Sequence, residues 1–234
     1  MIELKNIYKI YEMAGETLTA LEDVSLSINQ GDFTSIMGPS GSGKSTLMNV
    51  VGLLDSFDRG EYILNGQNIS EYSEKELAGI RNKEIGFVFQ SFNLMPRMSV
   101  LENVMLPLVY AGVSFSDRKE RAMEALEKVG LGNRVNHRPN EISGGQKQRV
   151  AIARSIVNKP AVVLADEPTG NLDSTTAEEI IRIFQELNRD GATIIMVTHE
   201  REVAKYTKKI VHLRDGKLMD EEVITPKRLI GGVH

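Results

Sequence analysis

A glycine-rich segment, GPSGSGKS at residues 38–45, restricts the fold of this chain more than any other feature. It fits the pattern G-x-x-x-x-G-K-[ST] in every fixed place, after the apolar run FTSIM and before the helical stretch STLMNVVGLL. Because glycine reaches positive φ without steric cost, such a loop can turn several N–H groups inward around an anion. The order of strand, loop and helix therefore predicts a phosphate-binding loop in an α/β protein.

The expected ligand of this loop is a nucleoside triphosphate with Mg²⁺. The N–H groups of residues 41–46 would surround the phosphates at a helix N-terminus, where free donors and the helix dipole favour negative charge. Lys44 would reach the β- and γ-phosphates, and the Ser45 hydroxyl would ligate Mg²⁺. The loop residues expected to contact the nucleotide are Gly38, Ser40, Gly41, Ser42, Gly43, Lys44, Ser45 and Thr46. The alternative is a glycine- and serine-rich turn that binds nothing.

Composition narrows the remaining classes of function. The 234 residues carry 28 Lys and Arg against 32 Asp and Glu, so a strongly basic surface for nucleic acid is not expected. The chain has no cysteine, which excludes disulfides and thiolate metal sites. No run approaches the roughly 18 apolar residues of a membrane helix, and the start, MIELKNIYKIYEM, lacks a signal-peptide segment. We expect a soluble polypeptide whose membrane role, if any, comes through a partner.

Strand patterns occupy both ends of the chain, and a helical pattern fills residues 99–157 between them. Asn65-Gly66 and Asp215-Gly216 are typical hairpin turns. This order predicts an α/β core interrupted by a helical insertion. The last segment, ITPKRLIGGVH, is expected to be a frayed tail.

Two carboxylates, Asp166 and Glu167, end the apolar strand in AVVLADEPTGNLD. Asp166 can meet Mg²⁺, directly or through water, while Glu167 can point at an attacking water. A strand that ends in a solvated acidic turn is the alternative. Beside a phosphate loop, the pair favours a phosphate-hydrolysing site.

The segment EISGGQKQRVAIARSIV, residues 141–157, supplies a second anion site. Ser143 can cap the helix that follows, and Gly144 and Gly145 leave its first N–H groups open. Together with the other segments it resembles the signature motif of ABC ATPases, usually LSGGQ, with Ile142 in place of Leu. The resemblance covers essentially the whole chain, because six separated segments appear in the family's order.

The resemblance implies one ABC ATPase domain over residues 1–234. Its P-loop NTPase (RecA-like) core, with an antiparallel β subdomain, would comprise residues 1–90 and 160–234. An inserted α-helical subdomain with the signature would comprise residues 91–159.

The resemblance also assigns roles to single residues. Tyr11 resembles the aromatic that stacks on adenine, Gln90 the glutamine that contacts Mg²⁺ and the water region, and His199 the histidine at the γ-phosphate. Each has a structural alternative. Tyr11 could be an aromatic of the core, Gln90 a solvated strand end, and His199 a structural histidine after a strand. The expected catalytic residues are Glu167, His199, Gln90 and Lys44, and the expected metal ligands are Ser45, Gln90 and Asp166. Further nucleotide contacts are expected from Ser143, Gly144, Gly145, Gln146 and, in the D-loop, Asp173. That loop has Gly170-Asn171 in place of the more usual Ser-Ala.

In this family the phosphate loop of one copy faces the signature helix of another across ATP. We therefore expect an ATP-sandwich homodimer on the cytoplasmic face of the cell membrane, bound to an integral membrane permease, with or without an extracytoplasmic adaptor protein. The chain resembles most the lipoprotein-releasing, macrolide-export and cell-division ATPases. Several of the apolar side chains of Phe92, Leu94, Met95 and Met98 are expected to dock the permease, the alternative being that this apolar stretch is helix core.

Two other classes remain open. A DNA-maintenance ATPase shares both motifs but requires a long coiled coil between them, and residues 45–143 carry no sustained heptads. A binding module could also use ATP as a switch without appreciable hydrolysis.

Overall fold

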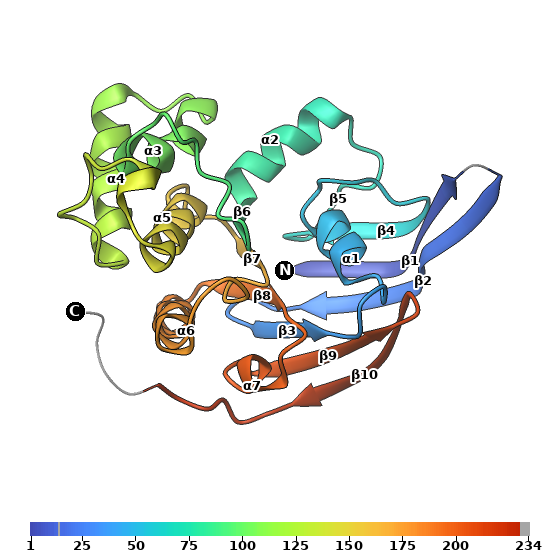
Figure 1. Cartoon of the computed structure of the whole chain (residues 1–234). Helices are drawn as coiled ribbons and strands as arrows, with labels where there is room; N and C mark the ends of the chain where they lie inside the picture. Colours follow the sequence, from blue (N-terminus) through green and yellow to red (C-terminus); the bar gives the residue numbers. More distant parts are fainter. Residues whose placement is uncertain (14, 230–234) are drawn as a thin grey trace.

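The computed structural model describes residues 1–13 and 15–229, which form two sheets and the helices around them (Figure 1). The smaller sheet is antiparallel, in the order β2-β1-β4-β5. Its strands are β1 (Ile2–Met13), β2 (Glu16–Ile28), β4 (Arg59–Leu64) and β5 (Gln67–Asn68). The predicted turn between β4 and β5 is present, with φ of 52° at Asn65 and 79° at Gly66.

The larger sheet has the order β10-β9-β3-β8-β7-β6. Its strands are β3 (Phe33–Met37), β6 (Ile85–Phe89), β7 (Val162–Asp166), β8 (Thr193–Val197), β9 (Lys209–Arg214) and β10 (Lys217–Val223). All neighbours pair in parallel except β10, which pairs antiparallel with β9. Every residue of β3 and β8 is buried, as continuous apolar strands of a covered parallel sheet require.

The helices are α1 (Lys44–Val51), α2 (Glu74–Glu84), α3 (Val100–Tyr110), α4 (Phe115–Lys128), α5 (Gly144–Ile156), α6 (Ser174–Arg189) and α7 (Arg201–Ala204), with a 3₁₀ turn at Pro139–Glu141. Helices α3 and α5 each begin with a serine cap and a Glu or Gln three residues later. No residue of α2 is fully buried, and only the partly buried Leu77 and Ile80 pack against an apolar core, so the sequence pattern did not reveal this helix.

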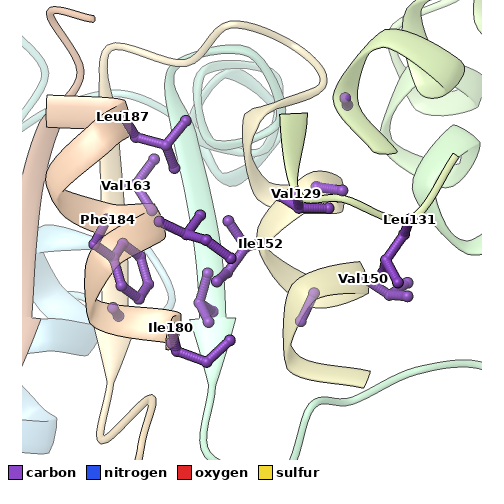
Figure 2. Close-up of a cluster of buried hydrophobic side chains, with 14 of the residues drawn as sticks. Val129, Leu131, Val150, Ile152, Val163, Ile180, Phe184 and Leu187 are labelled. Carbon is purple, nitrogen blue, oxygen red and sulfur yellow. The ribbon is translucent and has the colours of Figure 1, made fainter. Parts of the chain in front are cut away.

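One apolar core joins the helical insertion to the larger sheet. Figure 2 shows α5 between α6 and β7 on one side, where Ile152 lies near Val163 and Phe184, and Val129 and Leu131 on the other. A second core lies between the two sheets. Among residues 1–13 and 15–229, none of the helices is long and apolar enough to cross a bilayer.

The expectation of a frayed C-terminal tail is wrong for residues 224–229. Gln185 of α6 donates from Nε2 to the Lys227 carbonyl at 2.7 Å and accepts from the Leu229 N–H at 3.2 Å. The Leu229 side chain packs against the core, which compensates for ordering the segment. The remaining residues, 230–234, lie outside the described part of the chain.

Candidate active site

The expected catalytic residues follow four neighbouring strands at one edge of the larger sheet. In register, Phe89 lies opposite Asp166, Asp166 opposite Val197, and Val197 opposite Ile36. Gln90 and Glu167 come directly after Phe89 and Asp166, while His199 and the glycine-rich loop begin two residues after Val197 and Ile36. The carboxyl edge of a parallel sheet is where α/β proteins bind ligands, because the strands end there together.

A cleft of about 1090 Å³ opens at this edge. The sequence-predicted residues that line it are Tyr11, Ser40, Gly41, Gly43, Lys44, Ser45, Thr46, Gln90, Asp166, Glu167 and His199. Its wall also includes residues that were not predicted: Leu18, Thr19, Ala20, Pro39, Val197, Asp215 and Gly216. Leu18 pairs with Tyr11 in the register of β1 and β2, which the sequence alone did not reveal. Asp215-Gly216 was predicted as a hairpin turn but not as part of the site.

The glycine-rich loop has the conformation that an anion cradle needs. Gly41 and Gly43 have φ of 79° and 98°, the left-handed region that favours glycine. Nζ of Lys44 donates to the carbonyls of Gly38 and Pro39, both at 2.8 Å, so the ammonium lies over the loop. Gly38 and Ser42 do not line the cleft: a Cβ on Gly38 would meet the Leu213 carbonyl, and Ser42 is 1% exposed. These two residues belong to the buried side of the loop, where it packs against the protein.

The two carboxylates differ in their surroundings. Burial and the neighbouring Glu167 charge raise the pKa of Asp166, and Lys44 acts in the opposite direction. Glu167 has a φ of 41°, an uncommon conformation for a residue with a side chain, and its Oε1 lies 2.8 Å from Nδ1 of His199. The strained backbone aims Glu167 into the cleft and against the histidine.

Asp166→Asn should stabilise the ligand-free chain at neutral pH. The pKa of Asp166 is raised above its ordinary 3.8, so the folded chain binds this proton more tightly than the unfolded chain. Stability therefore falls as pH rises from about 4 through the raised pKa, and asparagine removes that loss. We expect thermal unfolding, followed by circular dichroism, to give a higher Tm for the variant at pH 7. The difference should shrink below pH 4; a lower Tm for the variant at pH 7 would contradict the assignment.

The residues fit a magnesium ion that arrives with a nucleotide. Ser45, Gln90 and Asp166 offer a hydroxyl, an amide oxygen and a carboxylate, the hard oxygen ligands that Mg²⁺ prefers. In the described part of the chain, no group of three or more His, Asp or Glu could hold a metal. Mg²⁺ usually binds through one or two carboxylates plus substrate phosphates, which agrees with this arrangement.

Two amide side chains that sequence reasoning missed hold the loops around the carboxylates. Asn171 donates to the Gln90 carbonyl at 3.1 Å and accepts from the Gln90 side chain at 3.3 Å. Gln148 of α5, fully buried, donates to the Pro168 carbonyl at 2.7 Å, one residue after Glu167. Helix α5 is thereby tied to the turn that carries Glu167.

The signature residues and Asp173 do not line the cleft. Ser143 caps α5, accepting from the Gln146 N–H at 3.2 Å and donating its own N–H to the Gln146 side chain at 3.0 Å. Asp173 caps α6 through Thr176, which lowers the pKa of Asp173. In Figure 1, α5 lies with α3 and α4, apart from α1. Within one copy, Ser143, Gly144, Gly145, Gln146 and Asp173 therefore stay away from the glycine-rich loop.

Comparison with known proteins shows which family has this sequence and fold. The family profile described as "ABC transporter" matches residues 21–170. The chain is 56% identical, over 94% of its length and 95% of the other's, to "Uncharacterized ABC transporter ATP-binding protein YknY" of Bacillus subtilis (strain 168). It is 52% identical, over 95% of its own length, to "Macrolide export ATP-binding/permease protein MacB" of Bdellovibrio bacteriovorus, but spans only 34% of that protein.

Among solved structures, the chain resembles a dimeric post-hydrolysis state of the ATP-binding cassette MJ0796 bound to ADP and Pi. The TM-score is 0.88 at 45% identity, covering 97% of this chain and 100% of the other.

Proposed function

Because the chain belongs to the ABC transporter family, we propose that it is the ATP-binding and ATP-hydrolysing subunit of a transporter, working with a membrane permease. The observation that supports this most is the cleft that collects the glycine-rich loop, Gln90, both carboxylates and His199. The resemblance to a cassette bound to ADP and Pi supports hydrolysis rather than binding alone. A purified chain should release phosphate from Mg²⁺-ATP; absence of release would favour a switch module.

In the proposed reaction, each residue of the cleft has a separate task. The loop N–H groups and Lys44 hold the phosphates, while Ser45, Gln90 and Asp166 hold Mg²⁺, which when bound neutralises phosphate charge. Glu167 takes a proton from the in-line water, and His199 and Gln90 align that water. Tyr11 stacks on the adenine. The domain limits proposed are those stated above, with residues 91–159 as the helical subdomain.

The second copy supplies what one chain lacks. Ser143, Gly144, Gly145, Gln146 and Asp173 stay away from the cleft of their own chain. We place the signature residues of a second copy across the ATP, where the N-terminus of α5 offers free N–H groups to the γ-phosphate. Hydrolysis followed by loss of the cleaved phosphate removes the group that holds the copies together, so they separate. The MJ0796 cassette is dimeric, also in a post-hydrolysis state with ADP and Pi bound, which supports a dimer that lasts until the phosphate leaves.

A groove of about 880 Å³ near Gln90 is the proposed docking site of the permease. Helices α2, α3 and α5 and strand β6 border it, and its lining includes Leu54, Leu106 and Tyr110 together with Arg81 and Arg154. The predicted docking residues, Phe92, Leu94, Met95 and Met98, lie outside this lining, and Leu94 packs against the core. An amphipathic helix of the permease would lay its apolar face here and turn its acidic groups to the arginines.

Tyr110→Asp should release the permease. Tyr110 is 76% exposed, so an aspartate there leaves the fold intact and adds charge to the groove. We expect crosslinking in cells, followed by mass spectrometry, to lose a polytopic membrane protein that the wild-type chain captures. Phosphate release by the purified variant should be unchanged. Phe115→Asp, 70% exposed and outside the groove, is the matched control; equal capture by both variants would move the docking site elsewhere.

The transported substrate is proposed at the level of class. We propose export or extraction of a substrate such as a lipoprotein, a peptide or a macrolide-like drug; of these, the name of the relative MacB supports macrolide export. No role in nucleic-acid binding is proposed, in line with the net charge of -4. The location proposed is the cytoplasmic face of the cell membrane, through the permease, with or without an extracytoplasmic adaptor.

A further inference from the structure

Next to Tyr11, the nearly buried side chain of Lys9 forms an ion pair with Asp55, whose side chain is 30% exposed. The Lys9 side chain is 8% exposed, and its Nζ lies 2.8 Å from Oδ1 of Asp55. The other carboxylate oxygen of Asp55 accepts the Tyr11 hydroxyl at 2.8 Å. Both oxygens of Asp55 are therefore engaged, one by each residue.

The same ammonium lies over the tyrosine ring, 5.0 Å from its centre. This is within the range of a cation–π contact. Tyr11 lines the cleft, whereas Lys9 and Asp55 do not. The ring is thus fixed at its hydroxyl and approached by a cation from the buried side, while it still borders the cleft.

The pair also connects β1 with the segment that follows α1. Asp55 lies four residues after the end of α1, and Asp58 accepts the Ile10 N–H at 2.6 Å. Burial raises the pKa of Tyr11, as does its bond to Asp55, while the Thr46 side chain of α1 acts the other way. The tyrosine therefore has neighbours on the helix that begins in the phosphate loop.

We propose that Lys9 and Asp55 are positioning residues that hold the Tyr11 ring ready for the purine base of the nucleotide. A ring fixed before binding loses less side-chain entropy when the base stacks on it. The inference rests on the proposed function, because it takes Tyr11 as the residue that stacks on adenine.

The pair also explains how a lysine can occupy so buried a place. A buried charge is tolerated when it is paired, and here the pair contacts a residue of the cleft. Burial acts to raise the pKa of Asp55, but the bonds from Lys9 and Tyr11 outweigh it and keep the pKa below its ordinary value. Asp55 is therefore an anion that accepts from both partners at neutral pH.

The test compares a ligand that carries a purine base with one that has phosphates alone. ADP and inorganic pyrophosphate would be titrated calorimetrically into the full chain, since neither requires hydrolysis. Tyr11→Phe removes only the bond to Asp55 and leaves the ion pair intact; Asp55→Asn removes the charge that holds both partners. We expect about threefold weaker ADP binding for Tyr11→Phe and about tenfold for Asp55→Asn, with pyrophosphate unchanged.

Glu3→Gln is the matched control, because Glu3 lies on the same strand in an exposed pair with Lys5 at 3.6 Å. Its ADP binding should equal that of the wild type. Tyr11→Ala tests the stacking role itself. If Tyr11→Ala weakens ADP binding while Tyr11→Phe and Asp55→Asn do not, the inference is wrong and the proposed function stands. If Tyr11→Ala has no effect, the stacking role is wrong as well. A parallel loss of pyrophosphate affinity would show that the pair supports the phosphate loop instead.

Discussion

Replacing Glu167 by glutamine should stop steady ATP hydrolysis and leave a dimer held together by ATP. Glutamine keeps the shape of the side chain, but it cannot take the proton of the attacking water. Loss of a general base costs about 10²- to 10⁴-fold in rate, so we expect phosphate release to fall below 1% of wild type. The loop that binds the phosphates is unchanged, and ATP should still bind.

The dimer is the second readout of this variant. In size-exclusion chromatography with ATP, the Glu167→Gln chain should elute as a dimer, and with ADP as a monomer, because only the γ-phosphate reaches the second copy. Glu200→Gln is the matched control, since Glu200 is exposed next to His199 but does not line the cleft. Normal turnover in Glu167→Gln would remove this residue from catalysis and leave His199 as the base to test.

Most of the fold follows from local patterns, because its strands are apolar and its helices are capped. FTSIM forms β3 over the same five residues, and the serine caps at Ser99 and Ser143 begin α3 and α5. Helix α2 was missed because none of its side chains is fully buried and its apolar contacts are limited to Leu77 and Ile80. The packing of residues 224–229 was missed because it depends on Gln185, a contact far away in sequence.

The candidate site likewise has residues that the sequence could predict and residues that it could not. Most of the polar residues that line the cleft come from motifs with fixed spacing, so the sequence could predict them together, whereas wall residues such as Leu18 and Val197 lie outside those motifs. The residues that support them, Asp55, Gln148 and Asn171, act through bonds to chain segments 20 to 81 residues away. A single polar residue in a helix or turn carries no signal of its partner. Such contacts require coordinates.

Gly144→Asp should separate ATP binding from dimer formation. Gly144 is the first residue of α5, and a Cβ there would meet only Leu172 and Phe92, at 3.6 and 4.0 Å, which are ordinary contacts. An aspartate at a helix N-terminus is favourable in the single chain, because it opposes the helix dipole. The variant should therefore be at least as stable to heat as the wild type. Its loss of activity would not be a loss of folding.

Across the dimer, the same carboxylate would face the γ-phosphate of the other copy. Two like charges there oppose association, so hydrolysis should fall about 100-fold or more, and Gly144→Asp combined with Glu167→Gln should remain monomeric with ATP. ATP binding to the single chain should be unchanged, because Gly144 does not line the cleft of its own chain. Gly144→Asn, with the same shape and no charge, should lose much less. A dimer in the Asp variant as stable as in the Asn variant would mean that the N-terminus of α5 does not meet the phosphate. ATP would then have to be held by one copy alone.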